Sequence, residues 1–180
     1  MIRGLIFDLD GTLVDSLPGI ATALNHALDD IKLPNHPQDV VETFIGDGLL
    51  NLVTRALSPD HSNQQNELLS AFQKHYSEDW KHGTSPYPGM TSLLEELHQS
   101  DMPMAVLSNK PHGYTVEIVE SLFPQNLFSQ VRGHQEGYPK KPDPTAAHQI
   151  ISDWNLKAEE VAYIGDSTVD LATARNGDMT

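Results

Sequence analysis

The sequence predicts an α/β fold, in which a parallel sheet carries helices on both faces and a small all-helical domain is inserted after the first strand. Residues 4–9, GLIFDL, are almost wholly apolar and stop at the segment DGT, as a central parallel strand does where it runs into a loop. Residues 16–83 show apolar residues at helical spacing and no convincing strand. From residue 91 onward helical and strand patterns alternate, which is typical of a Rossmann-like sheet.

The insert is expected to consist of four helices. Apolar residues recur at helical spacing from Ser16 to about Asp30, with Ser16 as N-cap and Pro18 tolerated in the first turn. Three further helical patterns are separated by Pro, Gly, Asn and Ser, and they lie near residues 37–44, 48–57 and 63–81.

An extended linker is expected where the insert ends. The segment TSPYPGM, residues 84–90, holds two prolines and a glycine, and such segments favour an extended chain or a hinge. The predicted domains are therefore a Rossmann-like core of residues 1–15 and 84–180 and a helical insert of residues 16–83.

The second half of the chain supplies the remaining strands. Predicted helices at 91–99, 112–122 and 144–154 precede the apolar segments MPMAVLSN, FSQVRG and VAYIGDS, and a last helix begins near Thr168. Because ligands of such folds bind at the carboxyl ends of the strands, the polar residues that follow each strand are the candidate site.

Composition limits the classes of partner. The 180 residues include 11 Lys and Arg against 25 Asp and Glu, and a net charge of −14 disfavours nucleic acid and anionic membranes. A small anion can still be held by a local cluster of lysines and backbone N–H groups. There is no cysteine, which excludes disulfides, a thiolate nucleophile and Cys-based zinc sites, and no apolar run of 18 residues. We expect a cytoplasmic protein.

The first polar cluster, Asp8-Leu9-Asp10-Gly11-Thr12, places two carboxylates on the same side at the tip of a strand. Two carboxylates about 4 Å apart repel by roughly 4 kcal/mol at an effective dielectric near 20, so the pair needs a cation, a shared proton or a chemical role. One carboxylate could attack and the other could transfer a proton, while Gly11 would allow a tight turn beside a ligand. For an isolated Asp-X-Asp, an Asx-turn would be the simpler explanation.

Two further clusters supply groups that bind anions. Ser108 and Asn109 end an apolar strand and open a predicted helix, whose first N–H groups could bind a phosphate or carboxylate. A simple pair of N-caps is the alternative. Lys140 and Lys141 stand before a helix start that prolines stiffen, which favours a functional role for one of them over a surface charge pair.

The fourth cluster, IGDSTVD, again ends an apolar strand, with Asp166 at the tip and Asp170 one helical turn later. Acidic residues also cap helices, so this cluster alone would decide little. Four strand ends that each carry one part of a site for an anion and a divalent metal are together specific.

These motifs resemble those of the haloacid dehalogenase superfamily of phosphotransferases. The signature lies in DLDGT at 8–12, LSN at 107–109, KPDP at 141–144 and GDSTVD at 165–170, and the likeness covers essentially the whole chain. The helical insert looks like the family's small cap. SNKP together with GDG at 46–48 looks most like the phosphoglycolate phosphatase branch.

The resemblance implies roles for the residues of the first strand end and its partners. Asp8 would be the nucleophile that forms an aspartyl-phosphate, and Asp10 the acid for the leaving alcohol and later the base for water. Mg²⁺ would be held by the carboxylates of Asp8 and Asp166 and the main-chain carbonyl of Asp10. Lys141 would contact both the nucleophile and the phosphoryl group.

Other matching positions would bind or support the phosphate. Ser108 would bind phosphoryl oxygens and assist catalysis. The remaining phosphate-binding positions implied are Gly11, Thr12, Asn109 and Lys110. Asp170 would support the metal site or Lys141 instead of binding the metal directly.

The expected activity is Mg²⁺-dependent hydrolysis of a small phosphorylated metabolite, with 2-phosphoglycolate as the leading substrate. The family's dehalogenases lack an acid at the position of Asp10, so its presence favours phosphate chemistry. A phosphomutase of the β-phosphoglucomutase type, which shares the same core, and a non-catalytic phosphate-binding module are the alternatives. Family members usually continue with another strand and helix after GDSTVDLATARNGDMT. Either the protein is naturally short or the sequence is a fragment, and an exposed sheet edge would favour marginal stability or dimerisation. A monomer or a homodimer is expected.

Overall fold

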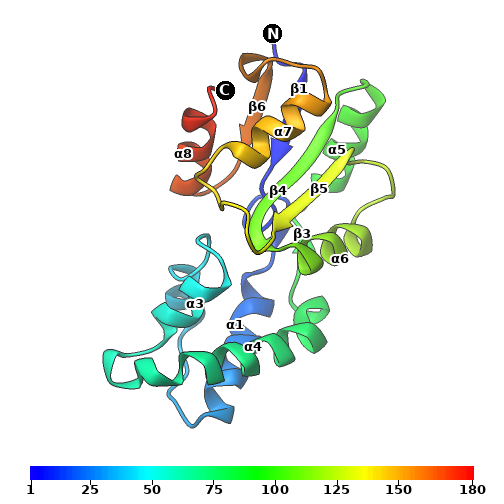
Figure 1. Ribbon diagram of the computed structural model, residues 1–180. Coiled ribbons are helices and arrows are strands. Elements are labelled where there is room, and N and C mark those ends of the chain that lie inside the picture. Colours follow the sequence, from blue (N-terminus) through cyan, green and yellow to red (C-terminus); the bar gives the residue numbers. More distant parts are fainter. The chain divides into compact units, whose positions relative to one another are not determined.

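The computed structural model describes residues 1–180, apart from the side chain of Asp79, and the chain forms two compact units. One unit comprises Met1–Val14 and Pro86–Thr180, and the other comprises Asp15–Ser85 (Figure 1). The predicted helical insert, residues 16–83, lies within the second unit. The first unit contains all four motifs.

The first unit is built on a parallel sheet, which confirms the predicted α/β fold. Its order is β5-β4-β1-β6, and every neighbouring pair is parallel. The four strands are β1 (Gly4–Phe7), β4 (Met104–Pro111), β5 (Gln130–His134) and β6 (Val161–Ile164). β1 pairs with β4 on one side and β6 on the other, so it is central, which explains why it is apolar on both faces.

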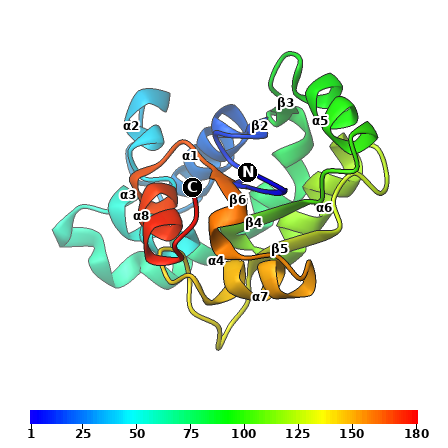
Figure 2. The ribbon, with the colours of Figure 1, turned by 90° about the horizontal axis from the view of Figure 1, so that it is seen from above.

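Helices cover both faces of this sheet. They are α5 (Met90–Gln99), α6 (His112–Leu122), α7 (Thr145–Asp153) and α8 (Thr168–Asn176), with a 3₁₀ turn at Ala158–Glu160. Figure 2 shows α5 and α6 on one face and α7 on the other. Side chains that alternate along the strands fill both layers: Ile6 packs with Ile150 and Ile151 of α7, whereas Phe7 meets Phe128 edge to face.

Strand β4 lies two residues later than the predicted segment MPMAVLSN. It runs through Ser108 and Asn109 to Pro111, and α6 begins at His112, where the sequence predicted it. Ser108 and Asn109 therefore lie inside the strand and not at the first turn of the helix, where the sequence expected them. The reason is the pairing with β5, which extends to Pro111 and His134 after a register shift. Such a pairing cannot be deduced from the local sequence.

The second unit is helical, as expected. It contains α1 (Leu17–Asp30), α2 (Gln38–Glu42), α3 (Leu49–Ala56) and α4 (Gln65–Asp79), with 3₁₀ turns at Pro59–Gln64 and Trp80–His82. α1 and α4 pack against each other, and the side chains buried in this unit include Leu24, Leu28, Leu68, Phe72, Tyr76 and Trp80. The chain passes between the units through the short strands β2 (Val14–Asp15) and β3 (Ser85–Pro86), which pair with each other. Within the part of the chain that the structure describes, no helix has the length and apolarity needed to cross a membrane.

Gly19 and Gly83 form a close backbone crossing inside the second unit. The N–H of Gly19 donates to the carbonyl of Gly83 at 2.9 Å, and a Cβ at position 83 would lie 2.4 Å from the nitrogen of Gly19. A side chain at 83 would therefore meet backbone that cannot move aside without breaking this hydrogen bond.

We predict that Gly83→Ala lowers the free energy of unfolding by about 1–3 kcal/mol, the usual cost of overpacking. Urea unfolding followed by circular dichroism measures it. Gly113→Ala is the matched control, because a Cβ there meets nothing within 4 Å and should be neutral or slightly stabilising in α6. Equal stability of the two variants would show that the close approach of Gly19 and Gly83 does not require glycine at position 83.

Candidate active site

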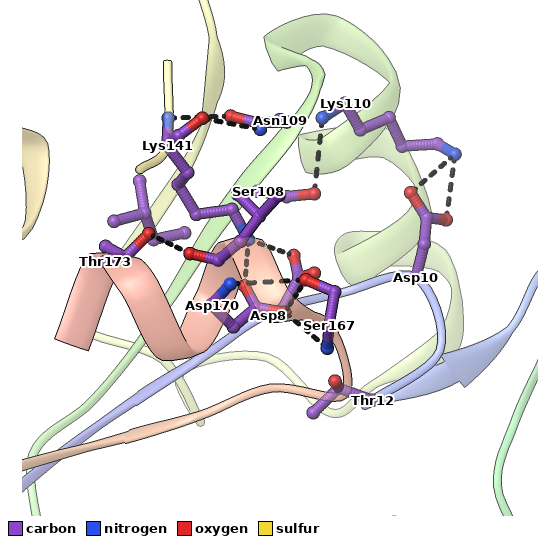
Figure 3. Close-up of polar contacts among 12 residues, drawn as sticks. Asp8, Asp10, Thr12, Ser108, Asn109, Lys110, Lys141, Ser167, Asp170 and Thr173 are labelled. Atoms are coloured by element: carbon purple, nitrogen blue, oxygen red, sulfur yellow. Dashed lines mark hydrogen bonds and ion pairs between the residues drawn. The ribbon is translucent and has the colours of Figure 1, made fainter. Parts of the chain in front are cut away.

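The candidate site begins where β1 ends. Asp8 follows Phe7 directly and is buried, with 7% of its surface exposed, and its N–H donates to the carbonyl of Ile164 in β6. Asp10 follows two residues later and is partly exposed. The central strand thus delivers both carboxylates to the carboxyl edge of the sheet, where the loops after β4, β5 and β6 also arrive (Figure 3).

Asp8 forms an ion pair with a buried lysine from the loop after β5. Lys141 Nζ lies 2.9 Å from Asp8 Oδ1 and 2.6 Å from Asp170 Oδ1. Burial raises the pKa of Asp8 to about 6, because the Lys141 ammonium offsets desolvation only in part and the nearby charges of Asp170 and Asp10 add to it. Burial alone would lower the pKa of Lys141, but its two carboxylate partners outweigh that effect and hold it above the ordinary value.

Lys141 is fixed in place by residues from two other strand ends. The side-chain amide of Asn109 makes two hydrogen bonds to the main chain of Lys141. Its Nδ2 donates to the Lys141 carbonyl at 3.1 Å, and its Oδ1 accepts from the Lys141 N–H at 2.9 Å. The ring of Tyr163 lies under the ammonium, 5.6 Å from its centroid, and the Tyr163 hydroxyl donates to the carbonyl of Leu107 at 2.9 Å. The side chain of Asn109 therefore hydrogen-bonds Lys141, whereas the resemblance implied that it binds the substrate phosphate.

Asp170 is held by the start of α8. Ser167 and Asp170 form a capping box, in which Asp170 Oδ2 accepts from the Ser167 N–H at 3.0 Å and from its hydroxyl at 2.5 Å. With its other oxygen on Lys141, this carboxylate is bound on both sides. Asp170 therefore connects Lys141 to the first turn of α8.

Asp166 stands at the end of β6 beside the loop after β1. The hydroxyl of Thr12 donates to Asp166 Oδ1 at 2.7 Å. Gly11 has a φ of +82°, and a Cβ there would lie 2.4 Å from Asp166 Oδ2. Glycine is required for both reasons, so Gly11 allows Asp166 to approach while Thr12 orients it.

Asp10 is paired with a second buried lysine. Lys110 Nζ donates to both carboxylate oxygens of Asp10, at 2.9 and 3.1 Å, and the two side chains are 6% and 14% exposed. The N–H of Lys110 donates to the Ser108 hydroxyl at 3.3 Å. Ser108 is itself buried, and Figure 3 shows its hydroxyl directed toward the main-chain nitrogen of Lys110.

The carboxylates at this edge fit a hard divalent cation. One oxygen from each of Asp8, Asp166 and Asp170 lies within 4.8 Å of the others. Among the described residues, the buried Oδ1 of Asp8 has no hydrogen-bond partner beyond its ion pair with Lys141. Carboxylate oxygens are the ligands that Mg²⁺ prefers, and because both oxygens of Asp170 already accept hydrogen bonds, Asp8 and Asp166 are the carboxylates that could hold such an ion.

Comparison with known proteins decides the family. The model of the haloacid dehalogenase-like hydrolases matches residues 5–180. This chain is a haloacid dehalogenase-like hydrolase. The resemblance drawn from the four motifs is thereby confirmed.

Several relatives of this hydrolase are named phosphoglycolate phosphatase. One from Yersinia pestis is 33% identical over 178 residues, covering 97% of this chain and 77% of the relative. One from Pectobacterium atrosepticum is 34% identical over 179 residues, covering 97% and 76%.

Solved structures agree with the fold. A predicted phosphoglycolate phosphatase from Haemophilus somnus superposes with a TM-score of 0.91 at 29% identity, covering 99% of this chain and 83% of that one. A haloacid dehalogenase-like family hydrolase from Streptococcus pneumoniae gives a TM-score of 0.88 at 26% identity, covering 99% and 82%.

The sequence analysis of this hydrolase did not single out two residues that hold Asp170 and Lys141 in place. It did not single out Ser167, although the Ser-x-x-Asp spacing with Asp170 is the pattern of a capping box. It also missed Tyr163, which lies inside an apolar strand with nothing in its local pattern to mark it. Lys110 was expected at the phosphate, but it lies on Asp10.

We predict that Lys141→Met destabilises the metal-free protein more at pH 7.5 than at pH 5. The change leaves Asp8 and Asp170 buried without their shared cation, which typically costs roughly 3–5 kcal/mol. A carboxyl whose pKa is higher folded than unfolded binds its proton more tightly in the folded state, so acid stabilises the fold through the window between the two values. For wild type that window runs from about 4 to about 6, and loss of the cation extends it upward.

Urea unfolding in EDTA at the two pH values measures the difference. Lys157→Met is the control, since Lys157 is 77% exposed and pairs only loosely with Glu159. An equal loss of stability at both pH values would show that Lys141 does not neutralise a buried carboxylate.

Proposed function

We propose that this haloacid dehalogenase-like hydrolase is a Mg²⁺-dependent phosphomonoesterase that works through an aspartyl-phosphate, with 2-phosphoglycolate as its substrate. The observation that carries the proposal is the buried Asp8 carboxylate held 2.9 Å from Lys141, with a second carboxylate, Asp10, two residues away. A nucleophile, a cation for the phosphoryl group and an acid or base thus lie at one sheet edge. The names of the relatives support the substrate.

In the first step one oxygen of Asp8 attacks phosphorus, and the bond to the leaving oxygen breaks as the new P–O bond forms. Asp10 supplies the proton that the leaving alkoxide takes up. Lys141 stays on Asp8 and neutralises charge on the phosphoryl oxygens, and the Ser108 hydroxyl donates to one of them. Because Lys141 is anchored by Asn109 and Asp170, this charge is in place before the reaction begins.

In the second step water attacks the phosphorus of the aspartyl-phosphate. Asp10 accepts the proton of the water, inorganic phosphate leaves and the Asp8 carboxylate is restored. Mg²⁺ bound by Asp8, Asp166 and the main-chain carbonyl of Asp10 would supply further positive charge for the phosphoryl oxygens. The cytoplasmic location and the monomeric or homodimeric state stay predictions.

We predict that wild type hydrolyses p-nitrophenyl phosphate in Mg²⁺ and that Asp8→Asn lowers turnover at least about 10³-fold, because the amide cannot form the covalent intermediate. Asp101→Asn makes the same chemical change at an exposed residue whose φ of +55° asparagine tolerates, and should keep wild-type activity. Circular dichroism checks the fold of each variant. Undiminished turnover by Asp8→Asn would remove Asp8 as nucleophile.

Removal of metal should abolish the activity reversibly. We expect EDTA to stop hydrolysis and added Mg²⁺ to restore it, and we expect Asp166→Asn to need at least about tenfold more Mg²⁺ for half-maximal activity. A titration of the rate against Mg²⁺ measures both. Full activity in EDTA would contradict the assignment of a metal to this site.

The substrate is tested with a panel of small phosphates, assayed for release of inorganic phosphate. We expect 2-phosphoglycolate to give the highest kcat/KM. A sugar-phosphate isomerisation assay run in parallel identifies a mutase, and isomerisation without phosphate release would replace the hydrolase by that activity.

A further inference from the structure

Lys110 is a buried cation whose position the catalytic scheme above does not use. Only 6% of its side chain is exposed, and its ammonium lies on the carboxylate of Asp10. Its main chain is fixed as well: the Thr115 hydroxyl donates to the Lys110 carbonyl at 3.2 Å. A Cβ at Gly133 would lie 2.6 Å from the same carbonyl, so β5 packs closely against it. The end of β4 therefore presents this ammonium from a rigid base.

The two buried lysines divide the site into two sides. Lys141 pairs with Asp8, whose carboxylate attacks phosphorus in the proposed mechanism. Lys110 pairs with Asp10, which protonates the leaving oxygen (Figure 3). Lys141 already supplies the cation for the phosphoryl group. The ammonium of Lys110 thus lies on the side of the leaving group.

The ammonium of Lys110 is close enough to the expected position of the leaving oxygen to contact a substituent of the leaving group. A general acid lies roughly 2.6–3.2 Å from the oxygen it protonates, and Lys110 Nζ lies 2.9 Å from Asp10 Oδ1. The ammonium is therefore at most roughly 6 Å from the leaving oxygen. A carboxylate on the carbon bonded to that oxygen has its own oxygens roughly 3 Å from it, given ordinary bond lengths. That reach is enough for one of them to bridge the gap to the Lys110 ammonium.

We propose that Lys110 is a specificity-determining residue, which binds a carboxylate carried by the alcohol part of the substrate. This inference rests on the proposed function and deepens it, because it selects phosphate esters of 2-hydroxy acids over esters of neutral alcohols. An ammonium can serve two carboxylates at once, as Lys141 does with Asp8 and Asp170. Burial strengthens the contact, since little water competes for the charge.

The test compares two substrates that differ only at the carboxylate. 2-Phosphoglycolate carries it, and 2-hydroxyethyl phosphate has a neutral CH₂OH in its place. We expect wild type to prefer 2-phosphoglycolate and Lys110→Met to lower that preference, as the ratio of the two kcat/KM values, roughly 10- to 100-fold. The ratio is the readout because any disturbance of Asp10 affects both substrates alike.

Two further variants frame the result. Lys110→Arg keeps the cation and should retain most of the preference, and Lys157→Met removes an exposed lysine and should leave both rates unchanged. Should Lys110→Met fail to fold, the wild-type ratio and Lys110→Arg still test the inference.

The outcomes that overturn the inference are distinct from failure of the proposed function. Lys110→Met lowering kcat/KM equally for both substrates would mean that Lys110 acts only through Asp10. Wild type hydrolysing both substrates equally well would show that no carboxylate is recognised, while leaving the phosphatase intact. Wild type hydrolysing neither these substrates nor p-nitrophenyl phosphate in Mg²⁺ would overturn the proposed function, and this inference with it.

Discussion

Two carboxylates at the tip of one buried strand repel each other, and the site depends on how that repulsion is neutralised. The solution is a separate buried lysine for each: Lys141 for Asp8 and Lys110 for Asp10, both at 2.9 Å. A buried carboxylate without such a partner would be strongly destabilising. With the two cations present, β1 can end in an acidic pair whose members face different partners and are free to take different chemical roles.

The parallel sheet makes these pairings possible. In the order β5-β4-β1-β6 the carboxyl ends of all four strands point to one edge, so the loops that follow them meet there. β4 contributes Lys110, the loop after β5 contributes Lys141, and the end of β6 contributes Asp166 and Asp170. An antiparallel partner for β1 would have sent its following loop to the opposite edge.

Much of the structure around the site serves to hold the lysines and acids still. The amide of Asn109 binds the main chain of Lys141, and the capping box of α8 fixes Asp170 against the same lysine. Thr12 orients Asp166, for which Gly11 leaves room. Charges that are positioned before a reaction need no reorganisation during it, so under the proposed function these rigid supports would serve catalysis as well as stability.

The sequence by itself determined the fold class and the family, and it directed attention to the polar residues that follow each strand. Two local patterns carried this information: the apolar run that ends at Asp8 and Asp10, and the alternation of helix and strand. Both patterns depend on which side chains of a segment are buried, and they can therefore be read without knowing the segment's neighbours. Only the tertiary structure decided which carboxylate each lysine pairs with. Asp10 and Lys110 are 100 residues apart, and Asn109 and Lys141 are 32 apart, so their contacts follow from strand order. The same reason explains the extension of β4 to Pro111, which pairing with β5 stabilises and which no local pattern reveals.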